Sequence, residues 1–171
     1  MRVKQETGGN LVIWSESPAE TEELGKVLGR ILLPGDLFFL SGDLGSGKTL
    51  LVRGVTIGLA STETATSPTF ALIHRYEGKL PLYHLDLYRL SGPADLAPLA
   101  LEEIMEEEAA FMIEWGEPAK ATLAATYMEV EFARGEQAED RVLSFYPVRD
   151  RYRQINHLLW QALEKEQTTG K

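Results

Sequence analysis

Residues 42–49 read GDLGSGKT and decide the fold of this chain. They match the pattern G-x-x-x-x-G-K-[ST], whose glycines let backbone N–H groups turn inward around the phosphates of a nucleotide. The apolar run Leu37–Leu40 before them is typical of a strand buried on both faces, and a helical pattern from about Lys48 to Leu59 follows them. This context disfavours the plain alternative, a glycine-rich turn with a surface lysine. The stretch therefore predicts a nucleotide site.

The pattern also assigns roles to the last two residues of the loop. The helix N-terminus adds partial positive charge beside the phosphates. We expect the ammonium group of Lys48 to reach the β and γ phosphates, and the hydroxyl of Thr49 to ligate Mg²⁺. The sequence has no Asn-Lys-x-Asp motif, the usual reader of guanine. The expected cofactors are therefore ATP and Mg²⁺.

Strand and helix patterns alternate on both sides of the loop. Leu11–Trp14 reads as a short strand, and Ser17 reads as the N-cap of an amphipathic helix that ends at Pro34. We expect further strands at 70–76, 82–88, 110–113, 127–132 and 141–146, and helices at 99–108 and around 155–163.

This alternation predicts the fold class. It favours an α/β fold, a single P-loop NTPase domain over residues 1–171 with a central, largely parallel sheet flanked by helices. The strands around Gly135 form an expected C-terminal antiparallel pair, and residues 147–171 form a basic, helical tail.

The composition excludes several classes of protein. The 171 residues include no cysteine, which excludes disulfides, cysteine–zinc sites, iron–sulfur clusters and a thiol nucleophile. No signal peptide is visible and no apolar run approaches the ~20 residues that span a bilayer, so we expect a cytoplasmic protein without membrane contact. Residues 1–140 carry 11 basic and 23 acidic side chains, a net charge of −12. That charge disfavours independent binding of DNA or RNA.

Two carboxylates are candidates for contact with the nucleotide and its metal. Asp86 lies in the segment LYHLDLYR, residues 82–89, where alternation puts it on the same strand face as His84. Glu114 closes the buried run that begins at Ala110. An acid at the carboxyl end of a buried strand lies at the rim where α/β proteins bind ligands. Without the loop, surface acids at strand ends would be the simpler interpretation.

Four further features have two interpretations each. Thr66–Thr69 is either a sensor of the γ phosphate or a plain turn. Trp115 is either a platform for a base or a partner, or a buried anchor. His84 has no identifiable serine or cysteine nucleophile beside it, so a catalytic triad is not supported, and a packed or hydrogen-bonded histidine is the plain interpretation. The acidic run Glu102–Glu108 is either a solvated helix face or a partner surface.

Four blocks of the sequence together resemble the TsaE family. They are GDLGSGKT at 42–49, SPTF at 67–70, HLDLYR at 84–89 and IEW at 113–115. That family is the small ATPase subunit of the bacterial machinery that makes threonylcarbamoyladenosine in tRNA. The phosphate loop alone is generic, and its combination with the other blocks over about residues 11–146 makes the match specific.

The resemblance implies a role for each site residue. Lys48, Asp86 and Glu114 would be catalytic, and Thr49 and Glu114 would help to bind Mg²⁺. Asp86 would contact the nucleotide–metal site, and Ser17 falls near the N-terminal segment that contacts the nucleotide. The ATP phosphates would be held by Gly45, Ser46, Gly47, Lys48, Thr49 and Leu50.

The resemblance also implies partners. The family works with TsaB and TsaD, and its ATP cycle supports repeated turnover by TsaD in threonylcarbamoyl transfer to the adenosine adjacent to the anticodon. The chain would meet tRNA only through that complex and would not itself transfer the group. We expect weak hydrolysis alone and faster hydrolysis with the partners, because no dedicated arginine finger is evident between Gly42 and Trp115. Arg75 and Arg89 are the alternative candidates for that role within the chain.

Two other function classes compete with this one. In a stand-alone small-molecule kinase, Arg149, Arg151 and Arg153 would belong to an arginine-rich lid, and Asp86 would deprotonate an acceptor hydroxyl. A nucleotide-binding module without hydrolysis is disfavoured by the two carboxylates at strand ends.

Overall fold

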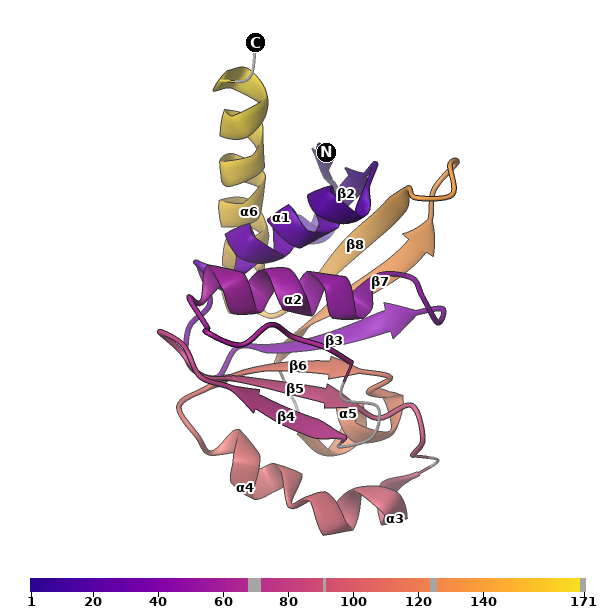
Figure 1. Cartoon of the computed structure of the whole chain (residues 1–171), viewed down its shortest axis with the longest axis vertical. Helices are drawn as coiled ribbons and strands as arrows, with labels where there is room; N and C mark the ends of the chain where they lie inside the picture. Colours follow the sequence, from indigo (N-terminus) through magenta and orange to yellow (C-terminus); the bar gives the residue numbers. More distant parts are fainter. Residues whose placement is uncertain (68–71, 91, 124–125, 170–171) are drawn as a thin grey trace.

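The computed structural model describes residues 1–67, 72–90, 92–123 and 126–169, which fold around one eight-stranded sheet with helices on both faces (Figure 1). The strand order is β1-β2-β8-β7-β3-β6-β5-β4. The strands are β1 (Arg2–Gln5), β2 (Leu11–Ser15), β3 (Leu37–Gly42), β4 (Ile73–Tyr76), β5 (Leu82–Asp86), β6 (Ala110–Glu114), β7 (Tyr127–Arg134) and β8 (Arg141–Val148). The helices are α1 (Pro18–Gly29), α2 (Lys48–Gly58), α3 (Pro93–Leu96), α4 (Leu101–Met105), α5 (Glu117–Leu123) and α6 (Asp150–Thr169), with short 3₁₀ turns at η1 (Thr7–Gly9) and η2 (Ala97–Leu99).

The middle of the sheet is parallel and its flanks are antiparallel. β3 pairs in parallel with both β6 and β7, and β5 pairs in parallel with β6. The pairs β1–β2, β2–β8, β7–β8 and β4–β5 are antiparallel. This topology confirms the predicted α/β fold with its parallel centre and its C-terminal antiparallel pair.

Strand β3 is buried on both faces, as its unbroken apolar sequence predicts. Phe38 and Leu40 belong to a hydrophobic core that includes side chains of α1, α2 and α6. Leu37 and Phe39 belong to a second core with side chains of β5, β6 and α3 to α5. The strand therefore runs through the centre of the domain, and the phosphate loop leaves it at the carboxyl edge of the parallel strands.

Helices α1 and α2 are in backbone contact. Gly25 and Gly29 of α1 face Gly54 and Gly58 of α2, and a Cβ at Gly54 would lie 2.0 Å from the carbonyl oxygen of Glu22. Any side chain there would separate the helices. Because α2 begins directly after the phosphate loop, this close contact ties the loop to α1.

Several element boundaries differ from the prediction. Helix α1 ends at Gly29 before Pro34, because the carboxylate of Asp36 accepts a hydrogen bond from the backbone N–H of Leu33 and turns the chain back into β3. Strand β5 ends at Asp86. The helix predicted at 99–108 is shortened to α4, and the sequence patterns do not predict β1, α3 or α5. Residues 68–71, where the strand from Phe70 was predicted to begin, lie outside the described residues, and β4 begins at Ile73.

The C-terminal segment packs on the first hydrophobic core. Residues 147–148 complete β8, and helix α6 buries Tyr152, Ile155 and Leu159. The guanidinium group of Arg151 pairs with Asp36, and the far end of α6 extends away from the sheet (Figure 1). Over the described part of the chain, no helix has the length and apolar character needed to cross a membrane.

Candidate nucleotide-binding site

The phosphate loop takes a backbone shape that its glycines permit. Gly42, Gly45 and Gly47 have φ values of 132°, 75° and 105°, in the left-handed region where other residues are strained. At Gly42 a Cβ would also lie 2.5 Å from the carbonyl oxygen of Phe132 on the neighbouring strand β7. Both conformation and space therefore require glycine where β3 passes into the loop.

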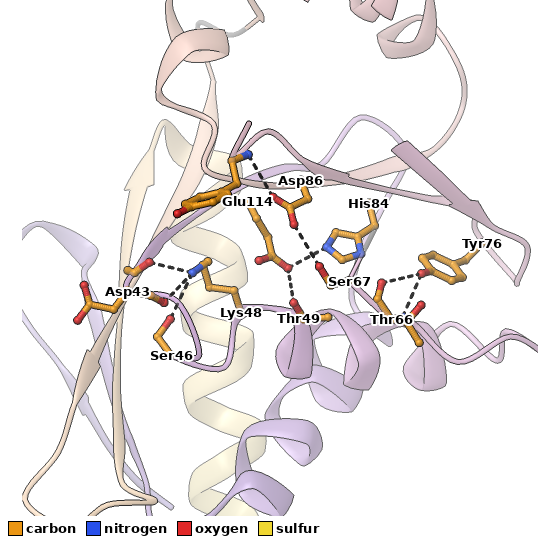
Figure 2. Close-up of polar contacts among 12 residues, drawn as sticks. Asp43, Ser46, Lys48, Thr49, Thr66, Ser67, Tyr76, His84, Asp86 and Glu114 are labelled. Carbon is orange, nitrogen blue, oxygen red and sulfur yellow. Dashed lines mark hydrogen bonds and ion pairs between the residues drawn. The ribbon is translucent and has the colours of Figure 1, made fainter. Parts of the chain in front are cut away.

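Lys48 is the first residue of α2, and its side chain folds back under the loop. The residue is 3% exposed, and Nζ donates hydrogen bonds to the carbonyl oxygens of Gly42 and Asp43 at 2.8 and 2.9 Å (Figure 2). Burial lowers the pKa of Lys48 from its ordinary value, while the nearby carboxylates, Glu114 first among them, act in the opposite direction. The loop thus holds a desolvated cation on acceptors that anionic oxygens could replace.

Glu114 lies directly opposite the start of α2. Its Oε1 accepts a hydrogen bond from the hydroxyl of Thr49 at 2.7 Å. The same oxygen lies 2.9 Å from Nε2 of His84 on strand β5, so Glu114 sits between the two (Figure 2). The residue is 4% exposed, and a carboxylate this buried requires such partners.

Asp86 is the register partner of Glu114 across the parallel pair β5–β6. Its Oδ2 accepts a hydrogen bond from the hydroxyl of Ser67 at 3.1 Å, and its Oδ1 accepts one from the backbone N–H of Tyr88 at 3.1 Å. Ser67 belongs to the segment Thr66–Thr69, for which the sequence leaves two interpretations, a γ-phosphate sensor or a plain turn. Pro68 and Thr69 of that segment lie outside the described residues.

These side chains line one cavity of about 480 Å³. Every predicted site residue except Ser17 lines it: Gly45, Ser46, Gly47, Lys48, Thr49, Leu50, Asp86 and Glu114. The other described residues on its wall are Leu44, Ser67, Tyr88 and Trp115. Ser17 instead caps α1, where its hydroxyl accepts a hydrogen bond from the backbone N–H of Glu20. Both carboxylates thus lie beside the loop: Glu114 at the strand end where it was predicted, and Asp86 at the end of β5, which is shorter than predicted.

Trp115 follows Glu114 and has a strained backbone. Its φ is 58°, in the left-handed region, and its half-buried ring lies 4.3 Å from Nζ of Lys48. The ring of Tyr88 meets it edge to face at 5.0 Å. The indole therefore packs directly on the cation of the phosphate loop.

Arg141 supports the loop from β8, and no pattern in the sequence pointed to it. Its Nε donates to the carbonyl oxygen of Ser46 at 3.0 Å, and its Nη2 donates to that of Gly45 at 3.4 Å. These two hydrogen bonds fix the backbone of the loop from the neighbouring strand. The contact spans about 95 residues of sequence, so no local motif could have shown it.

The oxygen atoms around the cavity fit a Mg²⁺ ion that is also bound by nucleotide phosphates. Thr49, Glu114 and Asp86 supply hydroxyl and carboxylate oxygens, the ligand type that Mg²⁺ prefers. Within the described ranges, no cluster of three or more His, Asp or Glu side chains could hold a metal by itself. Mg²⁺ characteristically binds through one or two carboxylates plus substrate phosphates. The residues therefore fit a metal that arrives with a nucleotide.

Two of the three arginines that the kinase hypothesis assigns to a lid, Arg151 and Arg153, are held away from the cavity. Arg151 pairs with Asp36, at the end of β3 opposite to the phosphate loop, and Arg153 pairs with Asp150 on its own helix. That part of the kinase hypothesis is wrong, because these two charges have their partners away from the cavity.

Known proteins resemble this chain in sequence and in structure. The sequence model of the family described as "Threonylcarbamoyl adenosine biosynthesis protein TsaE" matches residues 15–143. The tRNA threonylcarbamoyladenosine biosynthesis protein TsaE of Bacillus subtilis (strain 168) is 33% identical over 140 residues, which cover 81% of this chain and 87% of that protein. The protein of the same name from Nostoc sp. is 45% identical over 124 residues, 68% of this chain and 74% of its own. The crystal structure of Bacillus subtilis YdiB superposes with a TM-score of 0.77 at 28% identity, covering 95% of this chain and 98% of that one.

Proposed function

Because this chain belongs to the TsaE family, we propose that it is the Mg²⁺-dependent ATPase subunit of the machinery that forms threonylcarbamoyladenosine in tRNA. It would act in the cytoplasm with TsaB and TsaD, support transfer to the adenosine adjacent to the anticodon, and meet tRNA only through that complex. One observation carries the enzymatic part of the proposal: Lys48, Thr49, Asp86 and Glu114 converge on a single cavity.

Each of these side chains has a task in ATP binding and hydrolysis. The N–H groups from Gly45 to Leu50 bind phosphate oxygens, and the Lys48 ammonium exchanges its carbonyl acceptors for the β and γ phosphates. Thr49 and Glu114 hold the metal. When bound, Mg²⁺ neutralises phosphate charge and orients the phosphates. Asp86 completes the oxygen set, and Ser17 remains a proposed contact with the nucleotide.

The described part of the cavity wall carries a single positive charge, which supports a need for partners. Among the described residues on its wall, Lys48 is the one basic side chain. Charge that develops on the γ phosphate in the transition state needs a counter-charge, and one supplied by a partner is worth ~10³-fold or more in other phosphate-loop enzymes. We therefore propose that the isolated chain hydrolyses ATP slowly and that the assembled complex hydrolyses it faster.

The test is steady-state phosphate release by the chain alone, with TsaB and TsaD added, and with Lys48→Ala in the same mixtures. We expect a low rate alone, a higher rate with both partners, and only background with the variant. Formation of threonylcarbamoyladenosine on tRNA, measured in parallel, should follow the same order over repeated turnovers. A high rate of ATP consumption that does not change with the partners but rises with a small hydroxylated acceptor would favour the kinase class instead.

A further inference from the structure

His84 is fully buried, and the chemistry proposed above leaves it without a task. The side chain lies on β5, on the same strand face as Asp86, and is 0% exposed. Its Nε2 lies 2.9 Å from Oε1 of Glu114 on β6 (Figure 2). Nδ1 has no hydrogen-bond partner in the described part of the chain. An apolar side chain in this place would avoid that orphaned nitrogen, so the choice of histidine must be explained by its hydrogen bond to Glu114.

The contacts of the ring indicate where its proton lies. A proton on Nδ1 would be buried without an acceptor, and the lone pair of Nε2 would then face the oxygen of Glu114. With the proton on Nε2, the ring donates to that carboxylate and only the acceptor Nδ1 is left unpaired. The arrangement therefore favours the Nε2–H form, which is a hydrogen-bond donor to Glu114.

The bond from His84 ends on the oxygen that also meets the metal-binding end of α2. Oε1 of Glu114 accepts from His84 Nε2 and from Thr49 Oγ1, at 2.9 and 2.7 Å. With two donors from different elements on one oxygen, the carboxylate cannot rotate without breaking a buried hydrogen bond. The first donor belongs to the sheet, and the second belongs to the residue expected to ligate Mg²⁺.

We propose that His84 is a positioning residue, which orients the Glu114 carboxylate for the Mg²⁺ that accompanies the nucleotide; this inference rests on the proposed function. His84 acts through Glu114 and does not ligate the metal, because its Nε2 faces the Glu114 carboxylate and Mg²⁺ prefers oxygen ligands to imidazole. Groups that hydrogen-bond a metal ligand characteristically change metal affinity by 10–100-fold when removed. A ring that only fills space would have no such effect.

The structure offers variants that separate the hydrogen bond from the packing. His84→Phe and His84→Leu replace the imidazole donor by apolar side chains of two different shapes. Whichever variant folds can be used. His84→Gln retains an N–H donor at about the reach of Nε2. The matched control is His74→Phe, because His74 is the register partner of His84 on β4 and is only half-buried there.

The experiment is equilibrium binding of a fluorescent ADP analogue to the full chain, first with EDTA and then over a range of Mg²⁺ concentrations. Circular dichroism and thermal unfolding identify the folded variants. We expect His84→Phe or His84→Leu to raise the half-saturating Mg²⁺ concentration about tenfold or more, with affinity in EDTA unchanged. His84→Gln should lie within about threefold of the wild type, and His74→Phe should match it.

The two proposals fail in different ways. If the wild type binds the analogue and folded His84→Phe or His84→Leu has the same Mg²⁺ dependence, His84 is a packing residue and the inference is overturned. The inference is also overturned if His84→Gln is as impaired as the apolar variants. If the wild type binds no nucleotide at any Mg²⁺ concentration, the proposed function falls and takes this inference with it.

Discussion

Buried charge occurs in two regions of the molecule, and it is treated differently in each. Where β3 begins, Asp36 accepts two hydrogen bonds from Arg151 on α6, at 2.9 and 2.5 Å, and a third from the backbone of Leu33. Where β3 ends, Lys48 is equally buried but donates to the carbonyl oxygens of its own loop. In the first region a buried carboxylate forms an ion pair, and in the second a buried ammonium group is hydrogen-bonded to neutral carbonyl oxygens.

The difference separates residues that stabilise the fold from residues kept for a ligand. A buried ion pair with full hydrogen bonding is satisfied within the protein, so a phosphate has nothing to gain there. A desolvated ammonium with a lowered pKa is an unfavourable feature of the empty protein that anionic oxygens would relieve. Substitutions at the start of β3 should therefore change stability, and substitutions at its end should change activity.

The largest effect is expected for Lys48→Ala. The variant should lose ATP hydrolysis by about 100-fold or more and bind ATP weakly, because the charge beside the β and γ phosphates is gone. Stability should be preserved, because the substitution removes a buried charge and no apolar contact of the core. Phosphate release and thermal unfolding test both halves, with Arg53→Ala on the same helix as the control. Unchanged hydrolysis would remove Lys48 from the active site.

Glu114→Gln should produce a smaller but more selective loss. We expect hydrolysis to fall by roughly tenfold or more with ATP affinity less affected, because the carboxylate helps to place the metal or the attacking water. Asp86→Asn should impair metal-dependent binding or hydrolysis as well. Both variants are compared with the wild type at limiting Mg²⁺. If both variants hydrolyse ATP at the wild-type rate, the two carboxylates have a structural role. The end of β3 would then not differ from its start in serving a ligand.

Arg151→Met tests the other region. Removing the guanidinium leaves Asp36 buried with only the N–H of Leu33 as a donor, so the free energy of unfolding should fall by about 3 kcal/mol. Urea unfolding measures the loss. ATP affinity, measured under conditions where the variant is folded, should equal that of the wild type. A loss of affinity at full folding would mean that the two regions are coupled.

The sequence predicts local features of the site well. The loop and its helix depend on a contiguous strand–loop–helix pattern. Glu114 follows from the rule that ligands bind where buried strands end, and Asp86 from strand alternation and the family's second motif. The hydrogen bond from the backbone N–H of Glu20 confirms the N-cap role of Ser17. This role could be predicted because a helix cap depends on only four neighbouring residues. Contact of Ser17 with a nucleotide stays a prediction.

Features that depend on distant partners could not be predicted. Strand β1 has the pattern RVKQ with one apolar residue, so only its pairing with β2 makes it a strand. Arg141 reaches the loop because β8 is placed by the order of the sheet, and the bond between His84 and Glu114 depends on the register of β5 against β6. The sequence shows that these side chains are polar, but strand order and register decide which groups they contact.

The smallest effect concerns Tyr152, a buried titratable group on the stabilising side of the comparison. Its hydroxyl oxygen accepts a hydrogen bond from the backbone N–H of Leu37, and burial raises the pKa of the phenol while that hydrogen bond acts in the opposite direction. Below about pH 9 the phenol is neutral in both the folded and the unfolded chain, so it contributes no pH dependence. As the pH rises further, the unfolded chain ionises first and the folded state loses stability.

Tyr152→Phe should remove this dependence on pH. At neutral pH the variant should be about 1 kcal/mol less stable, because Leu37 loses its acceptor. Between about pH 9 and 11 the wild type should lose up to about 1.4 kcal/mol per pH unit more than the variant, so that the two curves converge. Urea unfolding at a series of pH values measures both. If the stability of the two proteins falls in parallel with pH, the phenol ionises as readily in the folded chain as in the unfolded chain. ATP affinity is the control, and it should be the same in both proteins because this buried group contacts only the core.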